Sequence, residues 1–161
     1  MNGPKDQLTE ITPTLLVIAG QDQFGEERSL GISTIRFKRS PVREGDPLII
    51  ENGFRAKGGP PRHIHLEQDE WFYVVEGEFV FEIGQERYTL TRGDSLFAPR
   101  RIPHAYAHVG DGHGSVLVAF FPAGKMEAFF RKVSRTNAMP TQSPKLWSDH
   151  GMEVVGPPLP V

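Results

Sequence analysis

Short segments of alternating or mostly apolar residues recur along the chain and predict many β-strands. Most of these segments are rich in β-branched and aromatic residues, which suit a pleated, half-buried surface. The 17 glycines and 14 prolines separate them at short intervals, as is typical of short strands joined by turns. The candidate strands are residues 15–19, 31–38, 47–54, 62–66, 70–75, 78–83, 87–90, 95–98, 104–109 and 115–121. The pattern therefore predicts an all-β sandwich or barrel.

The last forty residues have a different pattern. Met126, Phe129, Phe130 and Val133 follow the spacing of one apolar stripe on a helix, and we expect this helix to cover an open edge of the barrel. A second short helix is predicted for residues 144–150, and the proline-rich residues 156–160 should be extended. With no internal repeat and no long linker, the prediction is one domain over residues 1–161. Its barrel core covers about residues 30–121, and the C-terminal helix and extended tail cover residues 122–161.

Composition and charge narrow the classes of function. The 161 residues are 38% hydrophobic and 24% charged with a formal net charge of −2, so no global field attracts nucleic acid or anionic lipid. The basic run Arg36, Lys38 and Arg39 lacks interleaved aromatic residues and is interpreted as a solvated face. The absence of cysteine excludes disulfides, thiolate-bound zinc and thiol catalysis. We find no signal-peptide pattern in the first thirty residues and no run long enough to span a bilayer, so a cytoplasmic protein is expected.

Four residues have the spacing of metal ligands. His63 and His65 stand two apart in a predicted strand, so both project from the same face. Glu70 begins the next strand, and His104 begins a later one. If these strands are neighbours in a barrel, three imidazoles and one carboxylate converge on its interior. That set suits one divalent transition-metal ion, either Fe, Mn, Ni, Co, Cu or Zn, and an octahedral ion would keep two free positions. The alternative is a barrel that has these residues but binds no metal.

Two stretches of the chain resemble the paired motifs of the cupin superfamily. In residues 58–77 the His-x-His pair is followed five residues later by Glu70 and seven after that by Gly77. In residues 93–108 the matching positions are Gly93, Pro99 and His104. The two motifs with the segment between them cover a little under a third of the chain.

The chain departs from the cupin pattern at three positions. Lys57 stands where the first motif usually opens with glycine, Arg101 replaces an inner glycine, and His108 replaces a terminal asparagine. The rest of the chain resembles small single-domain bacterial cupins that are often compared with quercetin 2,3-dioxygenase. This resemblance implies a cupin double-stranded β-helix, a jelly-roll barrel, with a short C-terminal helical segment.

The same resemblance implies a metal-dependent dioxygenase that acts on an aromatic or enolic small molecule. In this hypothesis Glu70 is the catalytic residue, because it can ligate the metal or accept the proton of a substrate hydroxyl. Two alternatives remain open. The metal could act as a Lewis acid in an isomerase or lyase, or the barrel could bind a small molecule without turnover.

Three further side chains are candidates for substrate binding. Tyr106 and His108 share the strand parity of His104, and Phe72 shares that of Glu70, so all three should point into the barrel. Phe72 is also explained as a core aromatic. His108 is either a proton shuttle or second-layer hydrogen-bond partner of the metal site, or a hydrogen-bonded core histidine.

The N-terminal part of the chain predicts a homodimer. Leu15, Leu16, Val17 and Ile18 are consecutive rather than alternating, which indicates burial on both faces of a strand. A second copy of the chain could supply the second surface. The partners expected from the sequence are therefore a small-molecule substrate and a second subunit, with no nucleic acid and no membrane.

Overall fold

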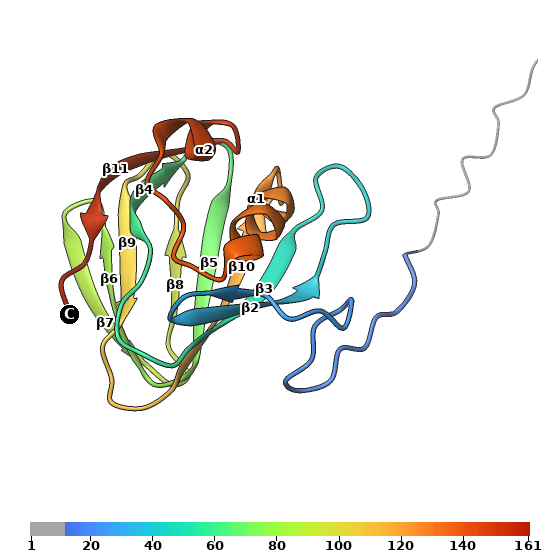
Figure 1. Ribbon diagram of the computed structural model, residues 1–161, viewed down its shortest axis with the longest axis horizontal. Coiled ribbons are helices and arrows are strands. Elements are labelled where there is room, and N and C mark those ends of the chain that lie inside the picture. Colours follow the sequence, from blue (N-terminus) through green and yellow to red (C-terminus); the bar gives the residue numbers. More distant parts are fainter. Residues whose placement is uncertain (1–11) are drawn as a thin grey trace, which may run out of the picture.

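The structure is a computed structural model in which residues 12–161 are described; the first eleven residues, which belong to the predicted domain, lie outside this range. Two antiparallel sheets face each other (Figure 1). The strands of the first sheet are, in spatial order, β1 (Ser29–Leu30), β2 (Ser33–Arg39), β3 (Leu48–Phe54), β10 (Gly114–Phe121), β5 (Asp69–Glu76) and β8 (Ser95–Ala98). The strands of the second sheet are β11 (Met152–Pro158), β4 (Pro61–His65), β9 (His104–His108), β6 (Glu78–Ile83) and β7 (Glu86–Thr91).

The chain passes repeatedly from one sheet to the other, from β3 to β4, from β4 to β5, and again from β8 to β9 and β10. This alternation between two antiparallel sheets is the jelly-roll topology, so the predicted fold class is confirmed. Nine of the ten predicted strands form within one or two residues of their predicted bounds. They form there because alternating burial is a local property of the sequence, as the pattern of β4 and β5 illustrates.

The predicted strand at residues 15–19 is wrong. This segment is not hydrogen-bonded to any strand within the described part of the chain, and the side chains of Leu15, Leu16 and Ile18 are 44%, 83% and 62% exposed. A segment becomes a β-strand only where the backbone of a neighbouring strand pairs with it. The apolar run at residues 15–18 predicts burial but does not itself provide a neighbouring strand.

The C-terminal segment contains α1 (Met126–Val133), the 3₁₀ turn η1 (Ser134–Thr136) and α2 (Pro144–Ser148). The apolar stripe of α1 is buried as predicted, and α2 buries Trp147. Residues 152–158, part of which was predicted only to be extended, form β11, which pairs with β4 at the edge of the second sheet. Beyond it, Leu159 packs with Val80, Ala105 and Ala107, whose small side chains leave room for it. None of the helices in residues 12–161 has the length and apolar character needed to cross a membrane.

Aromatic side chains fill the interior between the sheets. The rings of Phe72 and Phe81 lie 4.9 Å apart, and Phe81 stacks on Tyr106 at 5.3 Å. Gly59 passes close to β9, the strand of Tyr106. A Cβ added to Gly59 would lie 1.9 Å from the carbonyl oxygen of Tyr106. Only glycine permits that approach, which accounts for one of the two glycines before the His-x-His pair.

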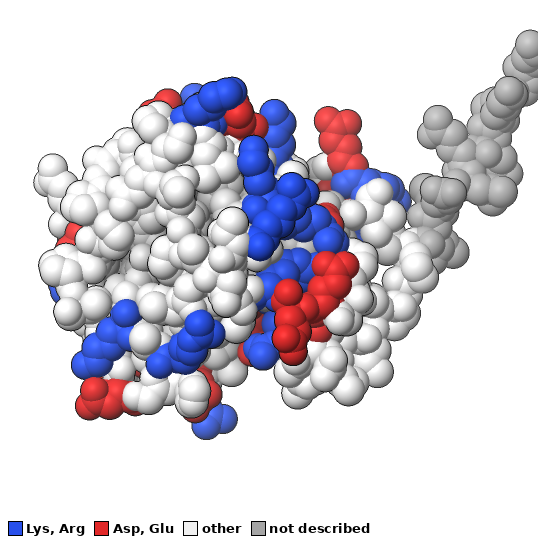
Figure 2. Space-filling model, viewed as in Figure 1, with Lys and Arg blue, Asp and Glu red and all other residues white. Residues whose placement is uncertain are grey.

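Charged side chains gather on the part of the molecule where α1, β2 and β3 lie, and Figure 2 shows few of them over β4, β6 and β9. The basic run on β2 is paired with acidic neighbours. Lys38 lies 3.1 Å from Glu51, and Arg39 lies 3.4 Å from Asp46. The positive charge of this run is therefore offset locally.

Arg101 adopts a backbone conformation that favours glycine. Its φ of 66° lies in the left-handed region, and its N–H donates to the carbonyl of His65 at 2.7 Å. The side chain donates from Nε to the carbonyl of Leu66 at 3.2 Å and lies 3.4 Å from Glu67. Arg101 therefore keeps the backbone turn that glycine would form at this position, and its side-chain contacts stabilise that turn.

We expect Arg101→Val to be less stable than Arg101→Gly by about 1–2 kcal/mol, because a β-branched residue is strained at positive φ and glycine is not. Both variants remove the same side-chain contacts, so the difference isolates the backbone conformation. Urea unfolding in the presence of a chelator measures it. Equal stabilities for the two variants would contradict the left-handed turn.

Candidate metal centre

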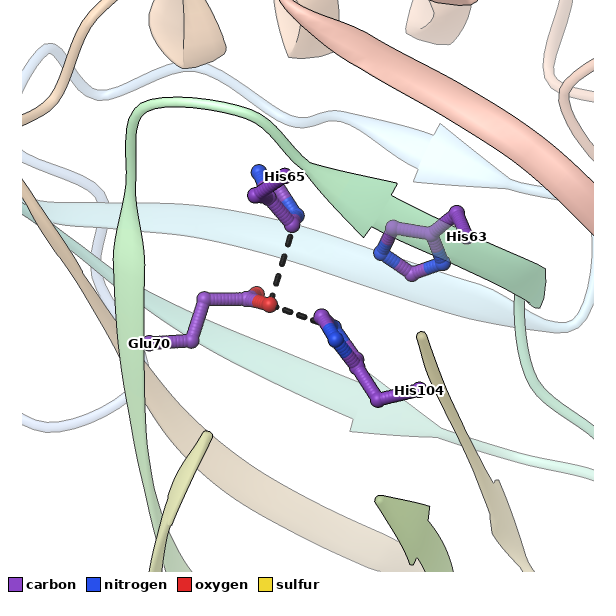
Figure 3. A group of neighbouring side chains, drawn as sticks. All are labelled: His63, His65, Glu70 and His104. Carbon is purple, nitrogen blue, oxygen red and sulfur yellow. Dashed lines mark ion pairs between the residues drawn. The ribbon is translucent and has the colours of Figure 1, made fainter. Parts of the chain in front are cut away.

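The two sheets bring the four predicted ligands together inside the barrel. The alternating burial of β4 turns His63 and His65 inward, and β9 pairs with β4 so that His104 lies opposite His63. Glu70 approaches from β5, which belongs to the other sheet. One donor atom from each residue lies within 4.8 Å of the other three, and Figure 3 shows the side chains converging. All four side chains are at least 95% buried.

The outer nitrogen of each imidazole, Nδ1, faces an oxygen atom that can accept a hydrogen bond. The pairs are His63 with the carbonyl of Pro61 (2.7 Å), His65 with Oε1 of Gln68 (3.3 Å) and His104 with the carbonyl of Ile102 (3.3 Å). Because a carbonyl oxygen only accepts, Nδ1 carries the proton in these pairs and Nε2 is left as the inward-facing donor to a metal. Such outer contacts orient histidine ligands in metal sites.

The carboxylate of Glu70 lacks the hydrogen bonds that usually accompany a buried charge. Its Oε2 lies 2.5 Å from Nε2 of His104 and 3.3 Å from Nε2 of His65, contacts marked in Figure 3. Yet neither Oε2 nor Nε2 of His104 has a hydrogen-bond partner among the described residues. Buried polar atoms without partners destabilise a folded chain unless something else satisfies them. A cation bound between them would do so.

The charges within the cluster shift each pKa in a definite direction. Burial raises the pKa of Glu70, but the imidazoles of His65 and His104 outweigh burial and lower it to about 2. Burial lowers the pKa of His104, but the carboxylate of Glu70 outweighs burial and raises it above 6.5. Burial lowers the pKa of both His63 and His65, and the neighbouring imidazoles lower that of His63 further. In the absence of metal, the cluster therefore favours the charged form of His104 beside an ionised Glu70.

The residues present fit a divalent transition-metal ion. Three imidazole nitrogens and one carboxylate oxygen form a donor set that such ions accept, and the unpartnered atoms face one another. The four side chains could thus hold one ion, and their chemistry leaves its identity open. A four-ligand set leaves room for further ligands if the ion is octahedral.

A small, mostly apolar cavity is lined by three of the four ligands, His63, His65 and Glu70. Its volume is about 50 Å³, well below the 300–1,000 Å³ of usual ligand pockets. Besides the ligands, its lining includes Phe120 of β10, Met126 and Phe129 of α1, Trp147 of α2 and Met152 of β11. The Trp147 ring lies 5.3 Å from that of His63. The two C-terminal helices therefore cover one side of the cavity beside the metal centre.

The predicted substrate-binding residues lie at different depths. Tyr106 lines the cavity, its hydroxyl donates to Oδ1 of Asn52 at 2.8 Å, and burial raises its pKa. Phe72 is fully buried beside His104, with ring centres 6.3 Å apart, and does not line the cavity. His108 also lies outside the cavity lining, near Phe79, with its Nδ1 3.4 Å from the carbonyl of Ala56.

Some supporting residues had no signal in the sequence. Gln68 positions His65, and Trp147 covers His63 from a helix more than eighty residues away in sequence. Asp69 begins β5 and accepts hydrogen bonds from the backbone N–H and guanidinium of Arg100 at 2.8–3.1 Å. This pair ties the Glu70 strand to the loop that leads to His104.

The fold and this cluster define a class of protein, a jelly-roll barrel with a candidate metal centre in its interior. Residues 53–120, less than half of the chain, match the family described as Cupin domain. These observations support assignment of the chain to the cupin superfamily, and its fold is a cupin jelly roll.

Individual similar proteins agree with that fold. The chain is similar to an RmlC-like cupin from Shewanella frigidimarina (TM-score 0.56, 24% identity, 71% of this chain and 96% of that one). It is also similar to KdgF from Halomonas sp. (TM-score 0.55, 23% identity, 63% and 92%) and to the nucleoside dehydratase Pac13 of Streptomyces (TM-score 0.52, 15% identity, 63% and 79%). An uncharacterized protein of Methanocaldococcus jannaschii, MJ1618, is 25% identical over 60 residues, which are 37% of this chain. The match spans about half, 48%, of that relative's length.

Metal binding should release about one proton between pH 6.5 and the raised pKa of His104. In that range His104 is protonated without metal, whereas His63 and His65 are neutral and Glu70 is ionised. Affinity for Zn²⁺ should therefore fall about tenfold per pH unit on acidification, and more steeply only below the lowered pKa values of the other two histidines.

Competition with a chromophoric chelator across pH 5–8 measures this dependence. The exposed turn residue His113 offers a control, since His113→Ala should keep the same slope. Release of two or three protons near pH 6.5 would contradict the pKa shifts of the three imidazoles described above.

Proposed function

We propose that the protein is a metal-dependent dioxygenase that acts on a small, uncharged aromatic or enolic compound. The observation that carries this proposal is a centre of three histidines and one glutamate at the wall of a small, mostly apolar cavity. The resemblance of the two sequence motifs to quercetinase-like cupins supports the choice of reaction. A divalent ion held there would acidify a substrate hydroxyl and promote its reaction with O₂.

The properties of Glu70 favour a substrate that already carries an enol or phenol. A carboxylate with a pKa of about 2 is a weak base. It suffices to accept a proton from an acidified O–H group, whereas an isomerase or lyase must usually remove a proton from carbon, which requires a stronger base. Tyr106 stays protonated because burial raises its pKa. It therefore lines the cavity as a hydrogen-bonding residue and does not act as a base.

The lining of the cavity supports an uncharged substrate. Apart from the proposed ligands, the lining contains no charged residue within the described chain. An apolar lining also strengthens the electrostatic interactions of Glu70 with the reacting group. Among the described residues, no Lys or Arg lines the cavity to pair with the phosphate of a phosphorylated sugar.

The test is O₂ uptake by protein loaded in turn with Fe, Mn, Ni, Co, Cu or Zn, across catechols, β-diketones and flavonols. We expect uptake with at least one metal and a small substrate, and loss of both metal and uptake in the His63→Ala, His65→Ala double variant. Glu70→Gln should lower the rate at least about 100-fold, the usual effect of losing a general base. Metal content is measured in parallel.

Substrate binding without O₂ uptake or product in any loaded form would favour a non-catalytic binding protein. Conversion of substrate without O₂ uptake would favour the isomerase or lyase. Either outcome would reject the dioxygenase.

We also propose that the chain forms a homodimer. The run from Leu15 to Ile18 is extended and largely exposed in a single chain. Apolar side chains gathered in one exposed segment typically mark an interaction surface. With a net charge of only −2, two copies repel each other weakly.

Light scattering should give about twice the chain mass of 18.0 kDa at micromolar concentration. Leu16→Asp should shift the mass toward one chain because it places a charge within the apolar run. Thr14→Asp, at an exposed position beside the run, is the control and should leave the dimer intact. A mass near 18.0 kDa for the unaltered protein would overturn the dimer.

A further inference from the structure

A second interior cavity lies beside the metal cavity. Its volume is about 60 Å³, close to the roughly 50 Å³ of the first. The side chains that line both cavities are Pro60, Tyr106, Phe129, Phe130 and Trp147. Because the two linings share these residues, the cavities lie on either side of a wall that is mostly aromatic. Phe129 and Trp147 belong to α1 and α2, so movement of side chains on these helices would join the two spaces.

The second cavity combines a mostly apolar lining with the polar side chains of Ser33, Asn52 and Tyr106. Leu30, Ile35 and Phe54 contribute apolar surface, and none of the lining residues in the described chain is charged. The hydroxyl of Tyr106 donates to Oδ1 of Asn52 at 2.8 Å, and Nδ2 of Asn52 donates to the carbonyl of Thr34 at 3.0 Å. One amide N–H of Asn52 and the lone pairs of the Tyr106 oxygen are left for a ligand.

The second cavity lies next to a groove on the surface, separated from it by Met139 and Pro140. Met139 and Pro140 line the second cavity and also line an outer groove of about 440 Å³ between α1, η1 and α2. The backbone N of Met139 would lie only 3.1 Å from a Cβ added to Gly31, so Met139 packs closely over the β1–β2 turn. A molecule that enters past Met139 and Pro140 reaches the second cavity before the metal cavity.

We propose that the second cavity binds the non-reacting end of the substrate. The substrate is then an elongated, uncharged molecule with an enolic or phenolic head at the metal and an apolar or aromatic tail beyond Tyr106. A polar atom of the tail accepts from Asn52 or donates to Tyr106. This inference rests on the proposed function, because it places the reacting head of the same molecule at the metal centre.

Two β-diketones with the same head distinguish the tail site from the metal site. Acetylacetone carries a methyl group at each end, and benzoylacetone replaces one methyl group with a phenyl ring. Binding is measured by calorimetry on the full chain loaded with redox-inert Zn²⁺. Benzoylacetone should bind at least about tenfold more tightly, since its phenyl ring is buried in apolar surroundings.

Variants that fill the second cavity should remove this preference. Ser33→Leu fills it from β2, and Leu30→Phe fills it independently from β1. Each should weaken benzoylacetone about tenfold and leave acetylacetone unchanged. Thr34→Leu is the matched control, because this neighbour of Ser33 on β2 does not line the cavity and should keep the preference. Melting temperatures show whether each variant is folded.

Equal affinities for the two probes in the unaltered protein, including no measurable binding of either, would overturn the proposal. So would a preference that survives in every folded filling variant. Oxygenase activity is a separate readout. A preference that the filling variants abolish, without O₂ uptake by any metal-loaded form, would support the tail site and reject the dioxygenase alone.

Discussion

The carboxylate of Glu70, buried between two sheets, is the constraint on which the other features of the site depend. A charge removed from water costs several kcal/mol unless partners offset the loss of hydration. Here the partners are the imidazoles of His65 and His104, which come from the opposite sheet. The two sheets must therefore keep their spacing for the charge to be tolerated. Because the cluster still leaves Oε2 without a hydrogen bond, a bound cation would complete it.

The packing around this cluster determines what it can bind. Phe72, Phe81 and Tyr106 fill the barrel on one side of the ligands, and the apolar faces of α1 and α2 close the other. This leaves a small, mostly apolar space in which the electrostatic effects of Glu70 are strong. It also means that any ligand larger than a few atoms depends on side-chain movement in the helices. The helices α1 and α2, and not the ligand set, thus limit the volume of this cavity.

The departures from the cupin motifs have separate structural consequences. Arg101 preserves the positive φ of the glycine that it replaces and adds contacts to the loop after His65. His108 occupies the far end of β9, away from the metal cavity, where a Cβ added to Gly114 would lie 2.7 Å from its Nε2. Neither change alters the four ligand positions. Arg101 and His108 therefore affect a turn and the end of a strand in the barrel, and not the four proposed metal ligands.

The sequence alone determined the features that depend on neighbours a few residues apart. Alternation with a period of two predicted the strands, and the His63–His65 spacing placed both imidazoles on one face, because side-chain direction in a strand is a local property. The tertiary structure decided what depends on distant contacts. Residues 15–19 lacked a pairing strand, residues 152–158 found one in β4, and Trp147 came to lie on His63. The second cavity likewise exists only where four strands and two helices fail to fill the space between them, which no local pattern records.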